Sequence, residues 1–217
     1  DVAVKFLAGG QSLGPMLNLR LVQPDLLVDI TAIAELKRIE EGADGITIGS
    51  CITHADIEDG RVPDVTRGAL RTVAAGIAYR AVRNRGTVGG SLCHADPAAD
   101  WTTALAALGA DAVVSDGARY RTVPVARLMR GAFETTVNSG EILQTIRIPR
   151  PSPGATLSIV NDIVDPAYIR LIISGVHTME EPDAVGYLTH LGESSYAGMN
   201  YAVYADDGSY KILNDRT

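Results

Sequence analysis

A change of composition near residue 153 divides this chain of 217 residues. Three prolines and a glycine fall between positions 149 and 154, a run that disfavours helix and is typical of an extended connector. Residues 1–153 carry 16 Lys and Arg against 17 Asp and Glu, whereas residues 154–217 carry 3 against 9 together with six of the eight tyrosines. The sequence therefore predicts two units, a body over 1–153 and an acidic, Tyr-rich segment of unknown type over 154–217.

The overall composition excludes several classes of protein. Apolar residues make up 46% and charged residues 21%, as in an ordinary globular protein. No apolar run approaches the ~20 residues that a membrane-spanning helix requires. The net charge of −7 argues against nucleic acid as the main partner. Cys51 and Cys93 are too few for a disulfide framework or for the four ligands of an iron–sulfur cluster, which favours a reduced, cytoplasmic protein whose metal chemistry, if any, lies in another subunit.

The hydrophobic pattern predicts short strands alternating with helices, and hence an α+β or α/β fold. Strands are expected at residues 2–7, 26–30 (buried), 46–48, 112–115, 119–125 and 141–148. Helices are expected at 54–59, where Thr53 is the candidate N-cap, at 65–82, and from the N-cap Asp96 to residue 108. In the C-terminal segment, residues 201–205 and 209–213 are predicted to form a hairpin around an Asp-Asp-Gly turn.

The first glycine-rich loop follows the first predicted strand directly. Its sequence is Ala8-Gly9-Gly10-Gln11-Ser12-Leu13. Glycines allow backbone N–H groups to converge on an anion, and Gln11 and Ser12 add side-chain donors. The loop matches neither the dinucleotide fingerprint nor a phosphate loop that ends in Gly-Lys-Ser/Thr. Taken alone, it is more typical of a simple turn than of a binding site.

The second glycine-rich loop begins where the predicted helix over 65–82 ends in basic residues. It runs Arg83-Asn84-Arg85-Gly86-Thr87-Val88-Gly89-Gly90-Ser91-Leu92, and Asp96-Pro97-Ala98-Ala99-Asp100 follows. Its backbone amides could cradle a diphosphate and Asp100 could accept hydrogen bonds from sugar hydroxyls. The alternative is a helix C-cap followed by an ordinary loop. The basic cluster of Arg80, Arg83 and Arg85 has two interpretations of equal weight. It could attract a phosphate or a partner subunit, or it could simply be the basic residues that a helix C-terminus favours.

Together these segments resemble the FAD-binding domain of molybdenum hydroxylases. The resemblance is closest to the medium, flavin-carrying subunit of the aerobic carbon monoxide dehydrogenase type, and xanthine dehydrogenase is a more distant relative. It extends through residues 19–21, 24–30, 53–56, 131–133 and 141–149. It covers residues 3–153 and leaves the C-terminal segment unmatched. About two dozen residues that usually precede the first motif, within the first lobe, have no counterpart in this chain.

The resemblance implies a two-lobed α+β flavin domain of the PCMH-like type, with FAD between its lobes. It also implies an oxidoreductase subunit that passes electrons from the [2Fe–2S] clusters of a small partner subunit, through FAD, to quinone, NAD or oxygen, while a large subunit oxidises the substrate at molybdenum. Neither a catalytic acid–base group nor a metal ligand is implied for this chain. The implied FAD-binding residues are Ala8, Gly9, Gly10, Gln11, Ser12, Leu13, Thr87, Val88, Gly89, Gly90, Ser91, Asp96 and Asp100, with Asp100 on the ribityl chain.

Two other functions remain open on the sequence. One is a stand-alone FAD-dependent oxidoreductase of the same flavin fold, and the other is a flavin-free structural or assembly module. Four residues beside the motifs also have two interpretations. Cys93 could face the flavin or be an ordinary buried thiol. His54 and His94 could hydrogen-bond a cofactor but lack a third metal ligand nearby. Trp101 is expected to pack within its helix or to contact a partner subunit.

Overall fold

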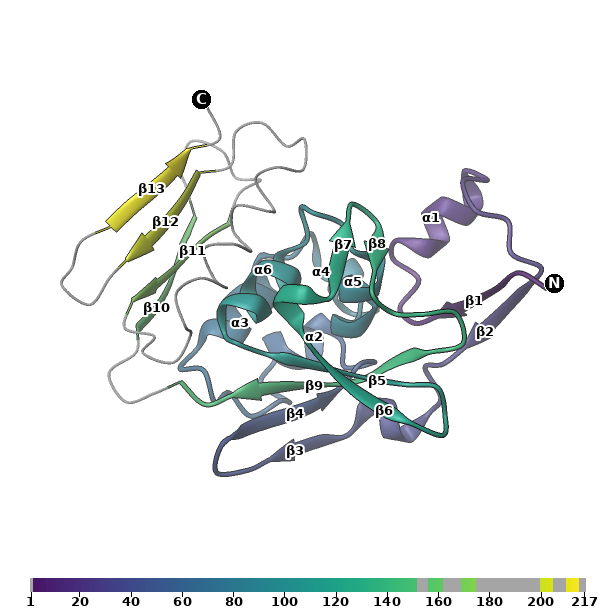
Figure 1. Cartoon of the computed structure of the whole chain (residues 1–217), viewed down its shortest axis with the longest axis horizontal. Coiled ribbons are helices and arrows are strands. Elements are labelled where there is room, and N and C mark those ends of the chain that lie inside the picture. Colours follow the sequence, from purple (N-terminus) through teal and green to yellow (C-terminus); the bar gives the residue numbers. More distant parts are fainter. Residues whose placement is uncertain (1, 152–155, 162–168, 175–199, 205–209, 215–217) are drawn as a thin grey trace.

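The computed structural model describes residues 2–151 and four strands in the C-terminal segment, at 156–161, 169–174, 200–204 and 210–214. The body is built on a five-stranded antiparallel sheet in the order β3-β4-β9-β5-β6 (Figure 1). Its strands are β3 (Ile39–Glu41), β4 (Gly45–Gly49), β5 (Asp111–Ser115), β6 (Tyr120–Pro124) and β9 (Ile142–Pro149). The predicted strands at 46–48, 112–115, 119–125 and 141–148 are thus confirmed, and β3 was not anticipated.

Helices cover one face of this sheet (Figure 1). They are α2 (His54–Glu58), α3 (Ala69–Gly76), α4 (Arg80–Arg83), α5 (Val88–His94) and α6 (Asp100–Ala107). The core forms where Ile46, Ile48 and Ile146 of the sheet meet apolar side chains of the helices, among them Leu70, Val73, Leu92, Trp101 and Leu105. Short elements complete the body: η1 (Ala34–Lys37), η2 (Val125–Arg127), β7 (Met129–Gly131) and β8 (Glu134–Thr135).

A second, smaller lobe is formed by the first thirty residues. Strand β1 (Val4–Leu7) pairs in parallel with β2 (Leu26–Asp29), and α1 (Leu13–Asn18) lies in the crossover between them. This lobe stands at one side of the body, near the N-terminus (Figure 1). It joins the body through a small cluster of Ile30, Leu36 and Cys51. The architecture is therefore two-lobed and α+β, as expected.

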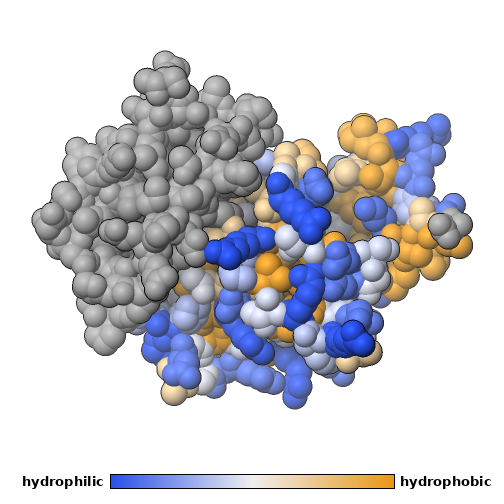
Figure 2. Space-filling view, viewed as in Figure 1, coloured by the Kyte–Doolittle hydropathy of each residue, from blue (hydrophilic) through white to orange (hydrophobic). Residues whose placement is uncertain are grey.

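The expected burial of residues 26–30 is wrong for most of that strand. Leu26 and Leu27 are 49% and 41% exposed, and only Ile30 at the end of the run is buried. Val4 and Phe6 on the paired strand are also exposed, and Figure 2 shows apolar residues gathered on the surface of this lobe. A two-stranded sheet offers these side chains no second layer within the described residues, so apolar sequence does not produce burial here.

The single helix expected over residues 65–82 is broken into two. Helix α3 ends at Gly76, Ala78 takes a left-handed conformation with φ of 42°, and α4 starts at Arg80. The Arg83 guanidinium donates to the carbonyls of Ile77 (3.0 Å) and Ala78 (3.1 Å). These bonds satisfy backbone acceptors that a continuous helix would have used internally, which explains how the break is stabilised.

The helix expected with Asp96 as its N-cap begins three residues later, with Ala99 as its N-cap. Asp96 instead shapes a turn, because its carboxylate accepts from the Ala98 N–H at 2.9 Å and its carbonyl accepts from the Ala99 N–H. Helix α6 then starts at Asp100 with Ala99 as its N-cap. The Asp-Pro pair therefore marks a turn rather than the first turn of the helix.

The described strands of the C-terminal segment form two antiparallel pairs. β10 (Thr156–Asn161) pairs with β11 (Ile169–Ser174), and β12 (Asn200–Tyr204) pairs with β13 (Tyr210–Asn214). The second pair confirms the two strands of the predicted hairpin, whereas its Asp-Asp-Gly turn lies outside the described residues, as do residues 152–155 of the predicted connector. Across the described part of the chain, none of the helices has the length and apolar character needed to span a membrane.

We expect the central strand to govern the stability of the body. Replacing Ile146, which is fully buried on β9, with Ala removes packing atoms and should lower the free energy of unfolding by about 2–5 kcal/mol. The matched control is Ile33→Ala, because Ile33 is 38% exposed and its loss should change that free energy by no more than about 0.5 kcal/mol. Urea denaturation followed by circular dichroism measures both, and equal losses would contradict this assignment of the core.

Candidate functional site

The two glycine-rich loops lie in direct backbone contact. A Cβ placed on Gly9 would fall 1.9 Å from the carbonyl oxygen of Arg85 and 2.8 Å from the Cα of Gly86. A Cβ on Gly90 would lie 3.7 Å from the Cβ of Ala8. Residues separated by more than seventy positions in the sequence are therefore packed together where the small lobe meets the helices of the body, and only glycine permits the approach at position 9.

The first loop has hydrogen-bond donors that are not used within the described part of the protein. Gly10 takes a left-handed conformation, with φ of 68°, and its carbonyl accepts from the Gly14 N–H at 2.9 Å. Within the described residues no hydrogen bond uses the N–H of Gly9, Gly10 or Gln11. The Ser12 hydroxyl does not cap α1, while the Gln11 side-chain amide donates to the Gly9 carbonyl. Backbone and hydroxyl donors without internal partners are what an anion-binding turn requires.

The second predicted loop is partly helical, because its residues Val88–Ser91 form the first turn of α5 with Thr87 as the N-cap. Four successive N–H groups are engaged inside the protein: Val88 donates to Ile52 O, Gly89 to Ser50 O, Gly90 to Thr87 Oγ1 and Ser91 to Thr87 O, at 2.9–3.1 Å. These four amides therefore already have acceptors inside the protein, and a role of this segment in holding a diphosphate stays a prediction that rests on its other donors. Thr87 and Ser91 still have hydroxyl protons to donate. A Cβ on Gly90 would lie 2.7 Å from Thr87 Oγ1, so Gly90 packs closely on the N-cap residue of α5.

The close packing of Gly89 on Ser50 explains why this segment is rigid. A Cβ there would lie 2.4 Å from the Cβ of Ser50, so Gly89 packs inward against the loop after β4. Val88 is also fully buried in the core. These two predicted site residues thus anchor this segment on the core, while Gly90 lies against Ala8 of the first loop.

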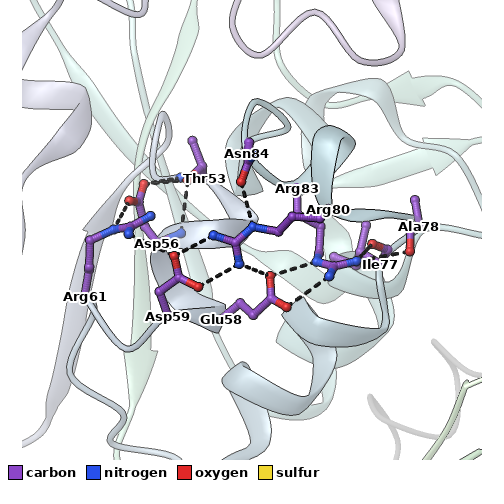
Figure 3. A network of polar contacts seen from close by, with 10 residues as sticks. All are labelled: Thr53, Asp56, Glu58, Asp59, Arg61, Ile77, Ala78, Arg80, Arg83 and Asn84. Atoms are coloured by element: carbon purple, nitrogen blue, oxygen red, sulfur yellow. Dashed lines mark hydrogen bonds and ion pairs between the residues drawn. The ribbon is translucent and has the colours of Figure 1, made fainter.

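An ion-pair ladder joins α2 to α4 just before the second loop (Figure 3). Arg83 donates from Nε and Nη2 to the two oxygens of Glu58, at 2.8 and 3.0 Å. Arg80 donates to both oxygens of Asp59 at 2.7 Å and also reaches Glu58. Hydrogen bonding by Arg80 lowers the pKa of Asp59 to about 2, so the carboxylate stays charged at neutral pH. Arg61 extends the ladder to Asp59 and Asp56.

The ladder separates the three arginines of this region by role. Arg80 and Arg83 are neutralised by carboxylates and hold α4 against α2, so they serve the fold. Arg85 is exposed, and its side chain takes part in no hydrogen bond or ion pair within the described residues. Attraction of a phosphate therefore remains a hypothesis for Arg85 alone, beside the carbonyl that touches Gly9.

Helix α2 is fixed at its N-terminus by a capping box. The Thr53 hydroxyl accepts from the Asp56 N–H, and the Asp56 carboxylate accepts from the Thr53 N–H at 2.9 Å. Thr53 also forms an isolated antiparallel bridge with Thr87, in which the His54 N–H donates to the Gly86 carbonyl at 3.0 Å. The Thr-x-x-Asp pattern at 53–56 is visible in the sequence and is a signal for this capping box, which holds Thr53 beside Thr87 of the second loop.

His54 is buried and neutral. Its Nδ1 accepts from the Trp101 indole N–H at 3.0 Å, across 47 positions of sequence. Burial, with a smaller effect of the nearby Arg83 charge, lowers the pKa of His54 to about 4. Trp101 itself is fully buried, which confirms helix packing over an exposed contact. Neither the histidine–tryptophan pair nor its contact with Gly86 could be read from sequence spacing.

Asp100 is the first residue of α6 and immediately precedes Trp101. Its carboxyl group is half-buried, and burial raises its pKa. No side chain of the described residues hydrogen-bonds this carboxylate, so it retains acceptor capacity for sugar hydroxyls. Asp96, by contrast, is occupied in the turn before α6.

Cys93 and His94 have features that limit their chemistry. The Cys93 side chain reaches solvent yet is closely surrounded by protein, and this loss of solvation raises its pKa to about 11. The group is therefore a thiol at neutral pH rather than a reactive thiolate. The His94 ring packs on Phe133 with ring centroids 5.2 Å apart. Within the described part of the chain, no three His, Cys, Asp or Glu residues are grouped to hold a metal ion.

These features define a nucleotide-cofactor domain, in which two glycine loops converge at the junction of two lobes. Residues 1–151 match the FAD binding domain in molybdopterin dehydrogenase, and the chain belongs to this family. The cofactor that the family binds is FAD. The site fits it, because the N–H groups of Gly9, Gly10 and Gln11 and the Ser12 hydroxyl have no hydrogen-bond partner within the described residues and can donate to a diphosphate.

Similar proteins are subunits of oxidoreductases. Caffeine dehydrogenase subunit beta of Pseudomonas sp. (strain CBB1) is 37% identical over 153 residues, covering 70% of this chain and 51% of the relative. The carbon monoxide dehydrogenase medium chain of Hydrogenophaga pseudoflava is 35% identical over 150 residues, covering 69% and 52%. The chain thus spans about half the length of the curated relatives it matches.

Solved structures agree with the fold. Quinoline 2-oxidoreductase from Pseudomonas putida 86 has a TM-score of 0.67 at 37% identity, over 72% of this chain and 55% of that one. Carbon monoxide dehydrogenase from Hydrogenophaga pseudoflava has a TM-score of 0.72 at 30% identity, over 79% and 64%. The expected family, fold class and cofactor are therefore confirmed.

Gly9 should be indispensable for binding FAD. In Gly9→Ala the new methyl group collides with the Arg85 carbonyl, so the loops must separate, and we expect the Kd for FAD to rise about a hundredfold or more. Gly42→Ala is the matched control, because a Cβ on Gly42 meets nothing nearer than 4.0 Å and should leave the Kd unchanged. Titration of each full-length variant with FAD measures this, and equal Kd values would contradict the packed-loop arrangement.

His54 should make stability depend on pH. The folded-state pKa of about 4 lies below the ordinary 6.5, so the unfolded chain binds more protons between these values and stability falls as the pH drops. The loss attributable to His54 is about 2 kcal/mol between about pH 7 and pH 5. Urea denaturation at both pH values should show a smaller difference for His54→Asn than for the parent chain. An unchanged difference would mean that His54 is not titrating in this way.

Proposed function

We propose that the chain is the flavin-carrying electron-transfer subunit of a molybdenum hydroxylase. Electrons would pass from the [2Fe–2S] clusters of a small partner subunit to FAD held by this chain, and from there to quinone, NAD or oxygen, while a large subunit carries the molybdenum cofactor. The observation that supports this most is the backbone contact between the two glycine loops, one of which keeps its N–H donors free. The similar proteins also carry names of subunits, as in the carbon monoxide dehydrogenase medium chain.

The roles of the site residues follow from the donors and acceptors they have left. Backbone N–H groups from Gly9 to Gln11 and the Ser12 hydroxyl would bind the FAD diphosphate, with Ala8 and Leu13 shaping the two ends of the loop. Thr87 and Ser91 would donate from their hydroxyl groups beside Gly90. Val88 and Gly89 would act by holding this loop on the core, and Asp96 by shaping the turn that leads to Asp100.

Asp100 would bind the ribityl hydroxyls. Its carboxylate is an acceptor without a side-chain partner in the described structure, and ribityl hydroxyls are donors. Bound FAD supplies the redox step, and the work of the protein is to bind and orient the cofactor and to exclude water from it. No proton transfer by a side chain of this chain is required, which is consistent with a neutral His54 and a protonated Cys93 thiol.

The division of the chain is part of this proposal. Residues 1–153 would form the FAD-binding domain, and residues 154–217 a separate acidic, Tyr-rich segment. The match to the family over residues 1–151 and the change in charge near residue 153 both support a boundary there. We also propose that the protein works in the cytoplasm, where the free thiols of Cys51 and Cys93 would stay reduced.

Purification of the 217-residue chain, followed by titration with FAD and heat release of the bound flavin, tests the proposal. We expect one FAD per chain and no oxidation of NADH or NADPH by the chain alone. Oxidation of either nucleotide without partners would favour the stand-alone oxidoreductase. A chain that stays colourless after incubation with FAD would contradict flavin binding and favour the structural or assembly module.

Asp100→Ala should weaken FAD binding without unfolding the protein. Removing an ionised acceptor from a hydroxyl donor costs about 1.5–3 kcal/mol, which corresponds to a rise in Kd of about tenfold to hundredfold. Asp44→Ala is the control, since Asp44 is an exposed carboxylate on the far hairpin between β3 and β4. The same FAD titration measures both variants. A Kd that responds equally to the two substitutions would contradict a ribityl contact at Asp100.

A further inference from the structure

We propose that His54 and Trp101 are positioning residues for the FAD site, and that the hydrogen bond between them sets the spacing of the second glycine loop and Asp100. This inference rests on the proposed binding of FAD at the two loops. Neither side chain needs to touch the cofactor. Their effect would pass through Gly86 on one side and through the first turn of α6 on the other.

The His54 side of the pair supports the glycine loops from beneath. A Cβ on Gly86 would lie 2.7 Å from His54 Nε2, so the loop backbone rests directly on the imidazole ring. The backbone N–H of His54 also donates to the Gly86 carbonyl at 3.0 Å. Gly86 in turn lies under Gly9, whose Cβ position is 2.8 Å from the Gly86 Cα. The ring, Gly86 and Gly9 therefore form three successive layers in contact.

The Trp101 side of the pair fixes the start of α6. Trp101 is the second residue of this helix and follows Asp100 directly. Its indole N–H is fully buried and donates to His54 Nδ1 at 3.0 Å. Since the indole ring is immobilised by the core and by this bond, the backbone of residue 100 has little freedom to shift relative to Gly86.

The chemistry of the pair requires one form of the histidine. An indole N–H has no acceptor capacity, so the bond exists only when Nδ1 is unprotonated and Nε2 carries the hydrogen. Burial keeps the ring neutral, in agreement with that tautomer. A phenylalanine at position 101 would fill most of the space but leave a buried acceptor without a partner. The bond is therefore specific in a way that apolar packing alone is not.

The ion-pair ladder acts on the same loop from outside and provides a contrast. Arg83 and Glu58 brace α4 before the loop, and their hydrogen bonds run to each other, to Arg80 and to the carbonyls of Ile77 and Ala78 rather than to α6. Loosening the ladder would move the loop, but it would leave Asp100 in place relative to the core. The His54–Trp101 bond joins the Gly86 side of the site directly to the start of α6, in addition to the packing of α5 on α6. Its loss, unlike loss of the ladder, should therefore change how much Asp100 contributes.

The experiment compares four variants of the full chain by FAD titration followed through flavin absorption, with the apo-protein Tm measured in parallel. Trp101→Phe and His54→Leu each remove one partner of the bond, and we expect the Kd for FAD to rise about tenfold in each. His54→Asn restores a carbonyl oxygen at the position of Nδ1 and should recover most of the affinity. Ile146→Val, in the sheet, is the control for a general loss of stability.

A double-mutant comparison with Asp100 distinguishes a positioning role from a purely structural one, because a purely structural role would leave the effect of Asp100→Asn on the Kd unchanged. Asp100→Asn should raise the Kd in the parent chain and have a much smaller effect in a Trp101→Phe background, because the carboxylate is then no longer held in register with the loop. Equal effects in both backgrounds, or a loss of affinity in Ile146→Val that matches Trp101→Phe at the same Tm, would overturn the positioning role.

The two proposals fail in different ways. If the parent chain binds no FAD, the proposed function is overturned and the positioning role with it. If the parent chain binds FAD and both Trp101→Phe and His54→Leu bind it equally well, only the positioning role is overturned. Should His54→Leu fail to fold, Trp101→Phe and His54→Asn still decide, because each keeps a ring or an acceptor within the core.

Discussion

The contact between Gly9 and the peptide linking Arg85 to Gly86 is the constraint on which the site depends. It brings the small parallel lobe against the helical side of the body without any intervening side chain, at a distance that excludes even a methyl group. Backbone contact of this kind fixes position more closely than side-chain packing, since it has no rotamers to adjust. Every residue that holds the 85–86 peptide in place therefore also helps to fix the position of the first loop.

Three supports hold that peptide in place, and they differ in physical kind. The His54 ring and the His54 N–H act from below, through burial and a backbone hydrogen bond. The Arg83–Glu58 pair acts on the preceding helix through charge, and its bidentate geometry gives direction that a single ion pair lacks. The Thr53–Thr87 bridge acts from the following side. Because solvent screens the ladder more than the buried pair, salt should loosen the outer support first.

Sequence reasoning predicted most strands, the cap at Thr53, the family and the two loops, because these depend on local pattern and on glycine spacing. It failed where tertiary contacts override local preference. The break in the helix over 65–82 is stabilised by Arg83, whose guanidinium satisfies the carbonyls of Ile77 and Ala78, a side-chain contact that hydrophobic periodicity does not contain. Leu26 and Leu27 are apolar yet exposed, since burial depends on what packs over a strand. The His54–Trp101 bond joins positions with no sequence relationship.

The two loops, similar in sequence, differ in function because their amides have different partners. Those of the second loop are consumed by Ile52, Ser50 and Thr87, which makes it a rigid platform, whereas those of the first remain available to a ligand. Because the second segment is already ordered before a ligand binds at the first loop, binding does not have to include the entropic cost of ordering it. Glycine permits a left-handed backbone conformation at Gly10, whereas it permits close packing at Gly9, Gly86 and Gly89. Substitution at the packing positions should accordingly cost both stability and affinity.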